Sequence, residues 1–590
     1  MENGCNGAIL RVDLSRNAFQ VETPEEDFYR TYFGGWGFVA YYLLKEVPPG
    51  TDALSPDNKL IFALGPVTGV PIAGSARNAV GARSPLTGLF GEADAGGWWN
   101  AELKRAGYDA IIFEGKAEKP VYLWVQDGEV EIRDATHLWG KTTAESQGMI
   151  RKELRDKRIR TAQIGPGGEN MVRYACVVND LRHTAGRCGI GAVMGSKNLK
   201  AVACRGHRLP EIADRQAVRE ITKWFTENYK ELSGTLPQYG MGYNLKGSSD
   251  GGGLPTHNFR DGVFEGAKKI SAETVMDTIG VRMGGCYACP IKCKKVVQAQ
   301  EPYKVHQIYG GPEYETLGSL GSCCGIDDAV AVSRGHELCN AYSIDTISTG
   351  VSIAFAMECY EKGLLTKKDT DGLDLHFGNA DAMVTLLEWI AYRKGFGAFV
   401  AEGTRRMAEK IGKASEAFAV HTKGQEAPMH DPRARGPELG MSYVMSPTGA
   451  DHVHTNLWSV FKNCATMCVV PRYSREQMRD IVNGVTGWGL SVEDLETVGE
   501  RAMDMARAFN ALEGLTAEDD RTAPRFLTGF SFGPREGQHI DAEELKQSKQ
   551  DYYEKMGWNP TLAVPTRKKL EELGIGWVAD TLARYDKALG

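Results

Sequence analysis

Three cysteines close together in the chain have the spacing of ligands for a metal centre. The stretch GGCYACPIKCKK at 284–295 carries Cys286, Cys289 and Cys293, separated by two and then three residues. A tetrahedral zinc ion and a [4Fe–4S] cluster each take four thiolates. Zinc sites usually carry two Cys-x2-Cys pairs, whereas one pair, a third nearby cysteine and one remote cysteine suit the corners of an iron–sulfur cubane. We favour the cluster and keep a structural zinc ion as the alternative.

The fourth ligand must come from the other cysteines of the chain, and their spacing does not select it. Five of them lie in apolar or strand-like surroundings and are expected to be packing thiols: Cys5, Cys176, Cys188, Cys204 and Cys359. The rest stay open as ligands, with packing favoured for the first pair: Cys323, Cys324, Cys339, Cys464 and Cys468.

Two short stretches carry side chains suited to acid–base chemistry on a carbonyl compound. GPEYET at 311–316 holds Glu313 and Glu315, and GADHVHTN at 449–456 holds His452 and His454. Oxidation of an aldehyde needs groups that remove protons and a donor that polarises the carbonyl oxygen. A solvated or structural role is the usual one for such residues, so their types alone leave the function open.

Glycine-rich loops in the first third of the chain would let backbone N–H groups approach a phosphate-bearing ligand closely. They span 65–69, 73–97 and 184–195. A Rossmann reading of GRCGIGAVMGSK is weak, because its glycines do not have that spacing. A P-loop reading fails, because Ser196-Lys197 reverses the required order of the lysine and the hydroxyl residue. Ordinary turn chemistry is the alternative.

The sequence patterns around these residues predict an α+β protein. Residues 1–208 are expected to form a β-rich domain, because 9–22 alternates in polarity and Asp127-Gly128 joins two strand-like runs. Helical patterns dominate from 209 onwards, with Val218, Ile221 and Phe225 on one face. A second division near 418 gives helical domains over 209–418 and 419–590.

Composition excludes several classes of protein. A chain of 590 residues is too long to fold around one hydrophobic core, so two to four domains are expected. The net charge of −7 gives no reason to expect nucleic acid as a partner. No apolar run reaches the roughly 18 residues of a membrane span, and no signal peptide is evident. We therefore expect a cytoplasmic protein whose cysteines are reduced thiols or metal ligands.

Over nearly its whole length the sequence resembles the tungsten-containing aldehyde ferredoxin oxidoreductase family. The order and number of the matching stretches carry the resemblance. They are LSPDNKLIFALGPVTG (54–69), RSPLTG (83–88), AELKRAGYDAIIFEGKAEKPVY (101–122), IGPGGEN (164–170), AGRCGIGAVMGSKNLKA (185–201), CYACPIKC (286–293), GPEYET (311–316) and IDTISTG (344–350).

The resemblance implies a tungsten-bis(pyranopterin), a cofactor of the molybdopterin type, beside one [4Fe–4S] cluster. The β-rich domain would lie under the pterins, and the two helical domains would cover them. An aldehyde would be oxidised to a carboxylate, and the electrons would pass to ferredoxin or a small iron–sulfur subunit. The cluster ligands would be Cys286, Cys289, Cys293 and Cys468.

The resemblance also assigns roles residue by residue. The catalytic glutamate corresponds to Glu315 and the active-site histidine to His452, with Glu313 as a further candidate. Arg77 would lie between cluster and pterin, and the backbone carbonyls of Asp94 and Thr184 would hold Mg²⁺ between the pterin phosphates. The remaining pterin contacts would be Ala95, Gly96, Ala185, Gly186, Arg187, Asn340, Ser343, Ile344, Asp345, Asn463, Thr466 and Met467.

Several positions depart from the family pattern. The two pterin motifs of the family, Asp-x-x-Gly-Leu-Asp/Cys, appear as NAYSID at 340–345 and NCATMC at 463–468. Asparagines therefore replace both leading aspartates and keep hydrogen bonding without the charge. The Glu-x-x-His motif that joins some homodimers through iron falls on Arg334 and Glu337. We expect a hetero-complex or another oligomer rather than an iron-bridged dimer.

We interpret the sequence as a tungsten-dependent oxidoreductase acting on aldehydes. A family member that reduces an aromatic acyl thioester is one alternative, and an electron-transfer or scaffold subunit with a degenerate active site is another. Tungsten and molybdenum are not distinguished, since the ligands of the metal come from the cofactor. We expect Glu315 to lie in the covered interior, where burial would raise its pKa.

Overall fold

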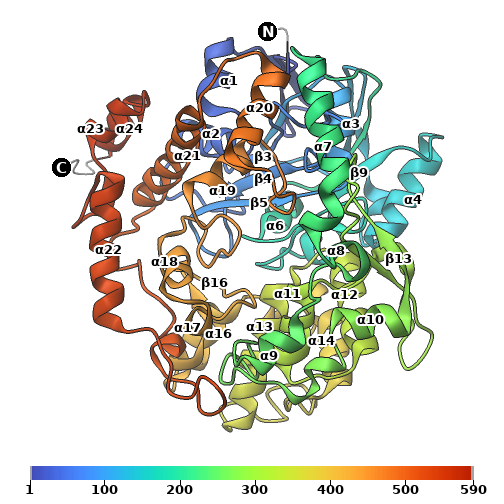
Figure 1. Cartoon of the computed structure of the whole chain (residues 1–590). Coiled ribbons are helices and arrows are strands. Elements are labelled where there is room, and N and C mark those ends of the chain that lie inside the picture. The colour runs from blue at the N-terminus through green and yellow to red at the C-terminus, as the bar shows by residue number, and fades with distance from the viewer. Residues whose placement is uncertain (1–2, 586–590) are drawn as a thin grey trace.

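Two six-stranded sheets form the first part of the computed structural model, which describes residues 3–585 (Figure 1). The first sheet has the order β2 (Ala18–Glu22), β1 (Ile9–Asp13), β6 (Ala110–Glu114), β3 (Leu60–Ala63), β4 (Asn78–Arg83) and β5 (Phe90–Ala95). The second has the order β11 (His183–Ala185), β10 (Val177–Asn179), β9 (Arg160–Gln163), β12 (Leu199–Arg205), β7 (Val121–Gln126) and β8 (Glu129–Asp134).

The two predicted hairpins are present. Strands β1 and β2 pair antiparallel, with Val12 opposite Phe19. Strands β7 and β8 are joined by Asp127 and Gly128, whose φ angles of 50° and 97° are both positive. A two-residue turn of this hand matches the right-handed twist of the flanking strands, which is why Asp-Gly was a strong hairpin signal.

Apolar side chains of both sheets share one core. Leu10, Phe62 and Ile111 of the first sheet belong to the same buried cluster as Leu123 and Val202 of the second. The opposite face of the first sheet is covered by α2 (Gly35–Glu46), and α19 (Leu457–Cys464) and α21 (Val492–Leu512) join the same core. Strand β5 is an edge strand of the first sheet and contacts α2 and α21.

The rest of the chain is mainly helical. Helix α7 (Arg215–Ser233) lies within the stretch predicted to be helical, and it begins after Asp214, whose side chain accepts hydrogen bonds from two backbone N–H groups. Helices α12 (Ala329–Tyr342) and α13 (Thr346–Glu361) lie in a second core, below the sheets in Figure 1. Helices α22 (Ala542–Met556), α23 (Arg567–Glu572) and α24 (Trp577–Arg584) lie at its left edge.

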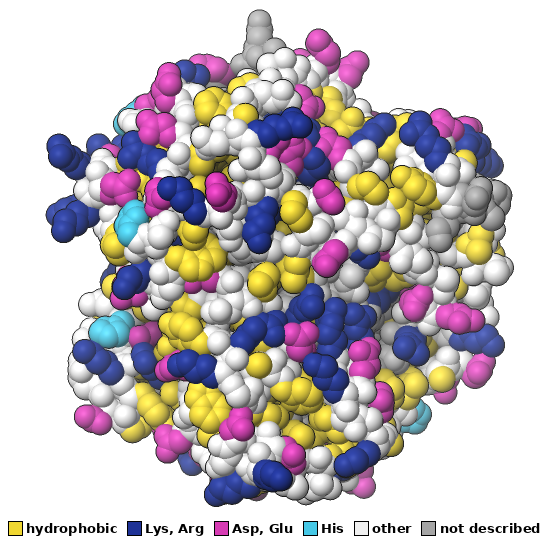
Figure 2. Space-filling model, turned by 180° about the vertical axis from the view of Figure 1, so that it is seen from behind, with side chains coloured by type: hydrophobic (Ala, Val, Ile, Leu, Met, Phe, Trp, Pro, Cys, Tyr) yellow, Lys and Arg dark blue, Asp and Glu magenta, His cyan; other side chains and the backbone are white. Residues whose placement is uncertain are grey.

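The predicted fold class is confirmed: a β-rich N-terminal part is followed by mainly helical parts. The predicted boundaries near 208 and 418 fall between β12 and α7 and after the short helix Ser415–Phe418, and they stay predictions. None of the helices within residues 3–585 is long and apolar enough to cross a membrane. Figure 2 shows side chains of both charges over the far face, with Lys and Arg gathered near its centre.

Candidate active site

A cavity of about 760 Å³ lies between the first sheet and the helical parts. Strand β5 contributes Glu92 and Asp94, and the helical parts contribute Glu315, His430 and His452. Cys286, Cys293 and Cys468 also line it, so the predicted acid–base residues and three of the predicted cluster ligands face one space. The sequence separates these groups widely, and the fold brings them together.

Glu315 lies beside two histidines in the wall of this cavity. Its Oε1 lies 3.1 Å from Nε2 of His430 and 3.4 Å from Nε2 of His452, and its Oε2 accepts a hydrogen bond from the N–H of Met429 at 2.7 Å. The His430 ring stacks on Tyr314, with the centroids 4.8 Å apart. The carboxylate and the two imidazoles lie close enough to share a proton or a single cation.

The expected rise in the pKa of Glu315 is wrong. Burial by itself raises this pKa, but His452, His430 and the N–H of Met429 outweigh burial and hold it below its ordinary value. Burial lowers the pKa of His452 against the opposing effect of Glu315. The prediction failed because neither histidine's contact with the glutamate was considered, and His430 was not considered at all.

Glu313 points to a different part of the site. Its Oε2 accepts a hydrogen bond from Nζ of Lys294 at 2.7 Å, and this lysine directly follows Cys293. Burial opposes ionisation of Glu313, but Lys294 and Lys295 outweigh it and lower the pKa. Glu313 is thus separated from the glutamate–histidine cluster by its ion pair beside the cysteines.

The four cysteines predicted as cluster ligands line one small cavity: Cys286, Cys289, Cys293 and Cys468. The N–H of Cys468 donates to the carbonyl of Gly74, and this hydrogen bond holds the segment around Cys468 against the loop around Gly74. A Cβ on Gly96 would lie 2.8 Å from Sγ of Cys286, so only glycine fits there. Cys464 is buried in the core around α2 and does not line this cavity.

Arg77 links this cysteine site to the large cavity. Its Nη1 donates to Oδ2 of Asp94 at 2.9 Å, and its Nη2 lies 3.4 Å from Sγ of Cys468. His183, which precedes Thr184 on β11, places Nδ1 3.7 Å from Sγ of Cys286. The arginine therefore contacts the cysteine set on one side and the cavity wall on the other.

The large cavity also has the chemistry that an anionic, hydrogen-bonding cofactor needs. Arg187 lines it and has Nε and Nη1 buried without a hydrogen-bond partner in the described part of the chain. Gly96, Thr184 and Gly186 line it as well. Donors of this kind, beside glycine backbone, fit a ligand that carries phosphates and many polar edges.

The first predicted pterin motif forms the junction between α12 and α13. Asn340, Ile344 and Asp345 line the cavity, and Asp345 caps α13 by accepting from the N–H groups of Ile347 and Ser348. Ser343 has φ 59° and accepts a hydrogen bond from the N–H of Gly165. A left-handed residue here explains why the family pattern has glycine, although serine occupies it in this chain.

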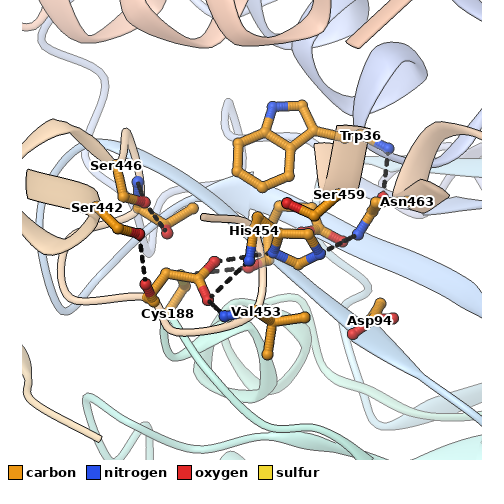
Figure 3. A network of polar contacts seen from close by, with 12 residues as sticks. Trp36, Asp94, Cys188, Ser442, Ser446, Val453, His454, Ser459 and Asn463 are labelled. Carbon is orange, nitrogen blue, oxygen red and sulfur yellow. Dashed lines mark hydrogen bonds and ion pairs between the residues drawn. The ribbon is translucent and has the colours of Figure 1, made fainter. Parts of the chain in front are cut away.

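The second predicted motif lies behind the cavity wall. Asn463, Thr466 and Met467 are buried but do not line the cavity. The carboxamide of Asn463 instead contacts Glu92 and His454, which do line it. Figure 3 shows the contact with His454. Ala95, Ala185 and Ser343 are likewise buried outside the lining, so their predicted contacts with a pterin stay predictions.

A polar network surrounds His454. Its Nδ1 lies 2.8 Å from Oδ2 of Asp451, and its ring meets Trp36 edge-on at 5.1 Å. Burial opposes its protonation, but Asp451 and Glu92 outweigh burial and raise the pKa of His454 to about 9. Burial raises the pKa of Glu92 to about 8, against the effect of His454.

Comparisons with known proteins identify the family. The family described as "Aldehyde ferredoxin oxidoreductase, N-terminal domain" matches residues 9–206, and "Aldehyde ferredoxin oxidoreductase, domains 2 & 3" matches 216–463 and 454–575. A tungsten-containing aldehyde ferredoxin oxidoreductase of Pyrococcus furiosus is 38% identical, over 96% of this chain and 98% of its own. The chain belongs to the aldehyde ferredoxin oxidoreductase family.

Proteins with other activities in their names are also similar to this member of the aldehyde ferredoxin oxidoreductase family. The WOR-like subunit of an aliphatic sulfonate oxidoreductase from Pyrococcus furiosus is 32% identical over 99% of both chains. A solved structure, the active site complex BamBC of benzoyl coenzyme A reductase with 1,5-dienoyl-CoA, matches with a TM-score of 0.86 and 26% identity over 100% of both chains. Because it belongs to this family, the protein is an oxidoreductase. The names of its relatives differ in substrate, so the family does not identify the substrate of this chain.

Sequence reasoning missed several residues of this oxidoreductase site. Glu92, His183 and His430 line the cavity, yet none stood out in the sequence. The chain has only 12 histidines, and five of them line this one cavity: His183, His336, His430, His452 and His454. Histidine's scarcity was the one signal that could have directed attention to His430.

Proposed function

We propose that the protein is a tungsten-bispterin oxidoreductase that oxidises aldehydes to carboxylic acids. Electrons pass through one [4Fe–4S] cluster to ferredoxin or an iron–sulfur partner subunit. The observation that carries the proposal is the Glu315 carboxylate between His430 and His452, in a cavity that also holds the cysteines. The names of the curated relatives, which include tungsten-containing aldehyde ferredoxin oxidoreductases, support it.

The chemistry assigns distinct work to the side chains. The oxidation is RCHO + H₂O → RCOO⁻ + 3 H⁺ + 2 e⁻, so a base must take protons as the C–O bond forms. Glu315 is ionised and accepts a proton from the attacking water. His452, neutral because burial lowers its pKa, donates a hydrogen bond to the aldehyde oxygen as negative charge develops there. His430 positions the carboxylate.

The residues present fit the cofactor. Arg77, Arg187 and the backbone at Gly96 and Gly186 would hold tungstopterin, and the four cysteines would hold the cluster. Bound there, the tungstopterin would accept the two electrons of the oxidation. Mg²⁺ between the pterin phosphates, held by the carbonyls of Asp94 and Thr184, is part of the same proposal.

Metal analysis combined with an aldehyde assay tests the function. We expect tungsten and about four irons per chain, with aldehyde-dependent reduction of an artificial electron acceptor. Iron without tungsten would favour an electron-transfer subunit. The full-length similarity to the benzoyl coenzyme A reductase complex supports a second candidate, reduction of an aromatic acyl thioester. Tungsten together with such a reduction and no aldehyde turnover would favour that candidate.

The pH dependence of turnover should follow His452 rather than Glu315. Because the pKa of Glu315 is below its ordinary 4.5, the carboxylate stays ionised at neutral and mildly acidic pH. Because the pKa of His452 is below 6.5, the imidazole becomes charged only under more acidic conditions. We expect kcat/KM to be level near neutrality and to fall only on the acidic side of the ordinary histidine pKa of 6.5. A fall that persists in His452→Gln would argue against this assignment.

Electrons are proposed to leave the protein through an arginine–aromatic surface beside the cysteines. Tyr287 lies between two of the cysteines in sequence, with the Arg105 guanidinium 4.9 Å over its ring. Trp98 is 37% exposed, meets Tyr287 edge-on at 5.7 Å and is covered by Arg160. Arg282, just before the triad, is exposed. Such a surface suits an acidic electron carrier.

Arg282→Glu should impair electron transfer to a protein acceptor and leave electron transfer to a small acceptor unaffected. A charge reversal at the rim of an interface slows association, so the KM for ferredoxin should rise several-fold and more steeply at low salt. Turnover with a small uncharged acceptor should be unchanged. Lys568→Glu is the matched control, because Lys568 is an exposed cation on α23 at the far edge of the molecule. Equal effects of both variants on ferredoxin would contradict a local docking surface.

A further inference from the structure

Glu92 has a carboxylate oxygen without a partner in the described chain. The residue is 3% exposed, lies on β5 and lines the large cavity. Its Oε1 accepts a hydrogen bond from Nδ2 of Asn463 at 3.1 Å, but its Oε2 is buried and receives no hydrogen bond from residues 3–585. Buried polar atoms nearly always have partners, so an unpaired one facing a cavity indicates a ligand.

Asn463 cannot serve that ligand itself, because its carboxamide is already engaged. Its Oδ1 accepts from the N–H of Trp36 at 2.9 Å, and its Nδ2 donates to Glu92 and lies 3.1 Å from Nε2 of His454. Figure 3 shows Asn463 between the Trp36 backbone and His454. The side chain at the position of the family's aspartate therefore lies behind Glu92 and His454.

The direction of β5 presents Glu92 to the cofactor space. Side chains two apart on a strand share a face, and Asp94, the next residue on that face, also lines the cavity. Asp94 is paired with Arg77. Within residues 3–585 Glu92 forms no ion pair, and its side chain accepts one hydrogen bond, from the Asn463 amide. It is thus the acidic group of this wall with a free acceptor.

We propose that Glu92 is the acceptor for the N–H edge of the second pterin, in place of the aspartate that Asn463 replaces. A pterin ring presents an amino group and a ring N–H along one edge, and both are donors that need an oxygen acceptor. Asn463 acts as a positioning residue that holds one oxygen of Glu92 so that the other faces the ring. This assignment rests on the proposed function, because it requires a bound pterin.

Glu92→Gln tests the two carboxylate oxygens separately, because it keeps one oxygen and replaces the other with an NH₂ group. The amide oxygen can keep the hydrogen bond from Asn463, which places an NH₂ group against the donors of the ring. We expect the fraction of chains that carry tungsten and pterin to fall by roughly tenfold, as for a buried donor left without an acceptor. The tungsten midpoint potential should shift in the chains that retain it. The iron content should stay at the wild-type value, which also reports that the variant is folded.

Two further variants sharpen the test. Glu92→Asp keeps the acceptor but withdraws it by one methylene, so its tungsten content should lie between those of wild type and Glu92→Gln. Glu513→Gln is the matched control: Glu513 has one oxygen bound by Arg83 and the other buried without a partner, and it does not line the cavity. It should keep wild-type tungsten. Two results would overturn the proposal. One is a Glu92→Gln protein with the tungsten content and midpoint potential of wild type. The other is a Glu92→Gln protein that contains more tungsten than Glu92→Asp.

The readout also distinguishes this assignment from the proposed function. If wild type contains tungstopterin but oxidises no aldehyde, while Glu92→Gln loses the cofactor, Glu92 keeps its role and the aldehyde function fails. If Glu92→Gln retains the cofactor and wild type oxidises aldehydes, the function stands and the role of Glu92 fails.

Discussion

Glu315→Gln should leave the protein folded, with tungsten, pterin and cluster in place, and reduce its turnover per tungsten atom by roughly 10²–10⁴-fold. The amide oxygen can still accept from the N–H of Met429, so the loop keeps its anchor. What the variant loses is the negative charge that takes a proton from water between His430 and His452. This factor is what positioned proton transfer contributes in general acid–base catalysis.

The control for this prediction is Glu313→Gln. Glu313 lines the same cavity but pairs with Lys294 beside the cysteines, so its loss should affect turnover far less. Rates must be expressed per tungsten atom rather than per chain. A Glu315→Gln enzyme with reduced tungsten content but normal turnover per tungsten would show that the carboxylate only holds the loop.

Cys468→Ser should remove or convert the [4Fe–4S] cluster, with a loss of iron and of its paramagnetic signal. Serine offers a poorer ligand than a thiolate at a site where four cysteines line one small cavity. Aldehyde-dependent reduction of any external acceptor should then nearly cease, because the route for electrons is broken.

Cys464→Ser is the matched control, four positions earlier on the same segment. Its thiol is 0% exposed in the core around α2, away from the cluster cavity. Replacing it should lower the melting temperature and leave the iron content unchanged. If Cys464→Ser loses iron while Cys468→Ser keeps all of it, the fourth ligand is Cys464 and our assignment of Cys468 is wrong.

The sequence predicted the parts of the fold that local chemistry decides. The Asp127-Gly128 turn has positive φ at both residues, a requirement that the two residues meet by themselves, so the signal is local. The resemblance supplied the site residues that face the cavity, including Glu315, His452 and Asp94.

The rest depended on contacts between distant segments. The low pKa of Glu315 follows from His430 and His452, which the chain brings in from more than one hundred positions away. The partners of Asn463 were out of reach for the same reason: its amide contacts Glu92 and the Trp36 backbone, both far away in sequence. Such pairings leave no local pattern in the residues themselves.

The position of Cys468 has a consequence for how the protein is made. Its N–H binds the Gly74 carbonyl, and its thiol joins a triad far earlier in the chain, so the cluster site is incomplete until synthesis has passed residue 468. If these cysteines hold the cluster, iron would be delivered to a nearly finished polypeptide. The cluster would then tie two distant segments together and limit the freedom of the unfolded chain, as a crosslink closing a long loop does. Resistance to heat should accordingly rise and fall with iron supply during growth.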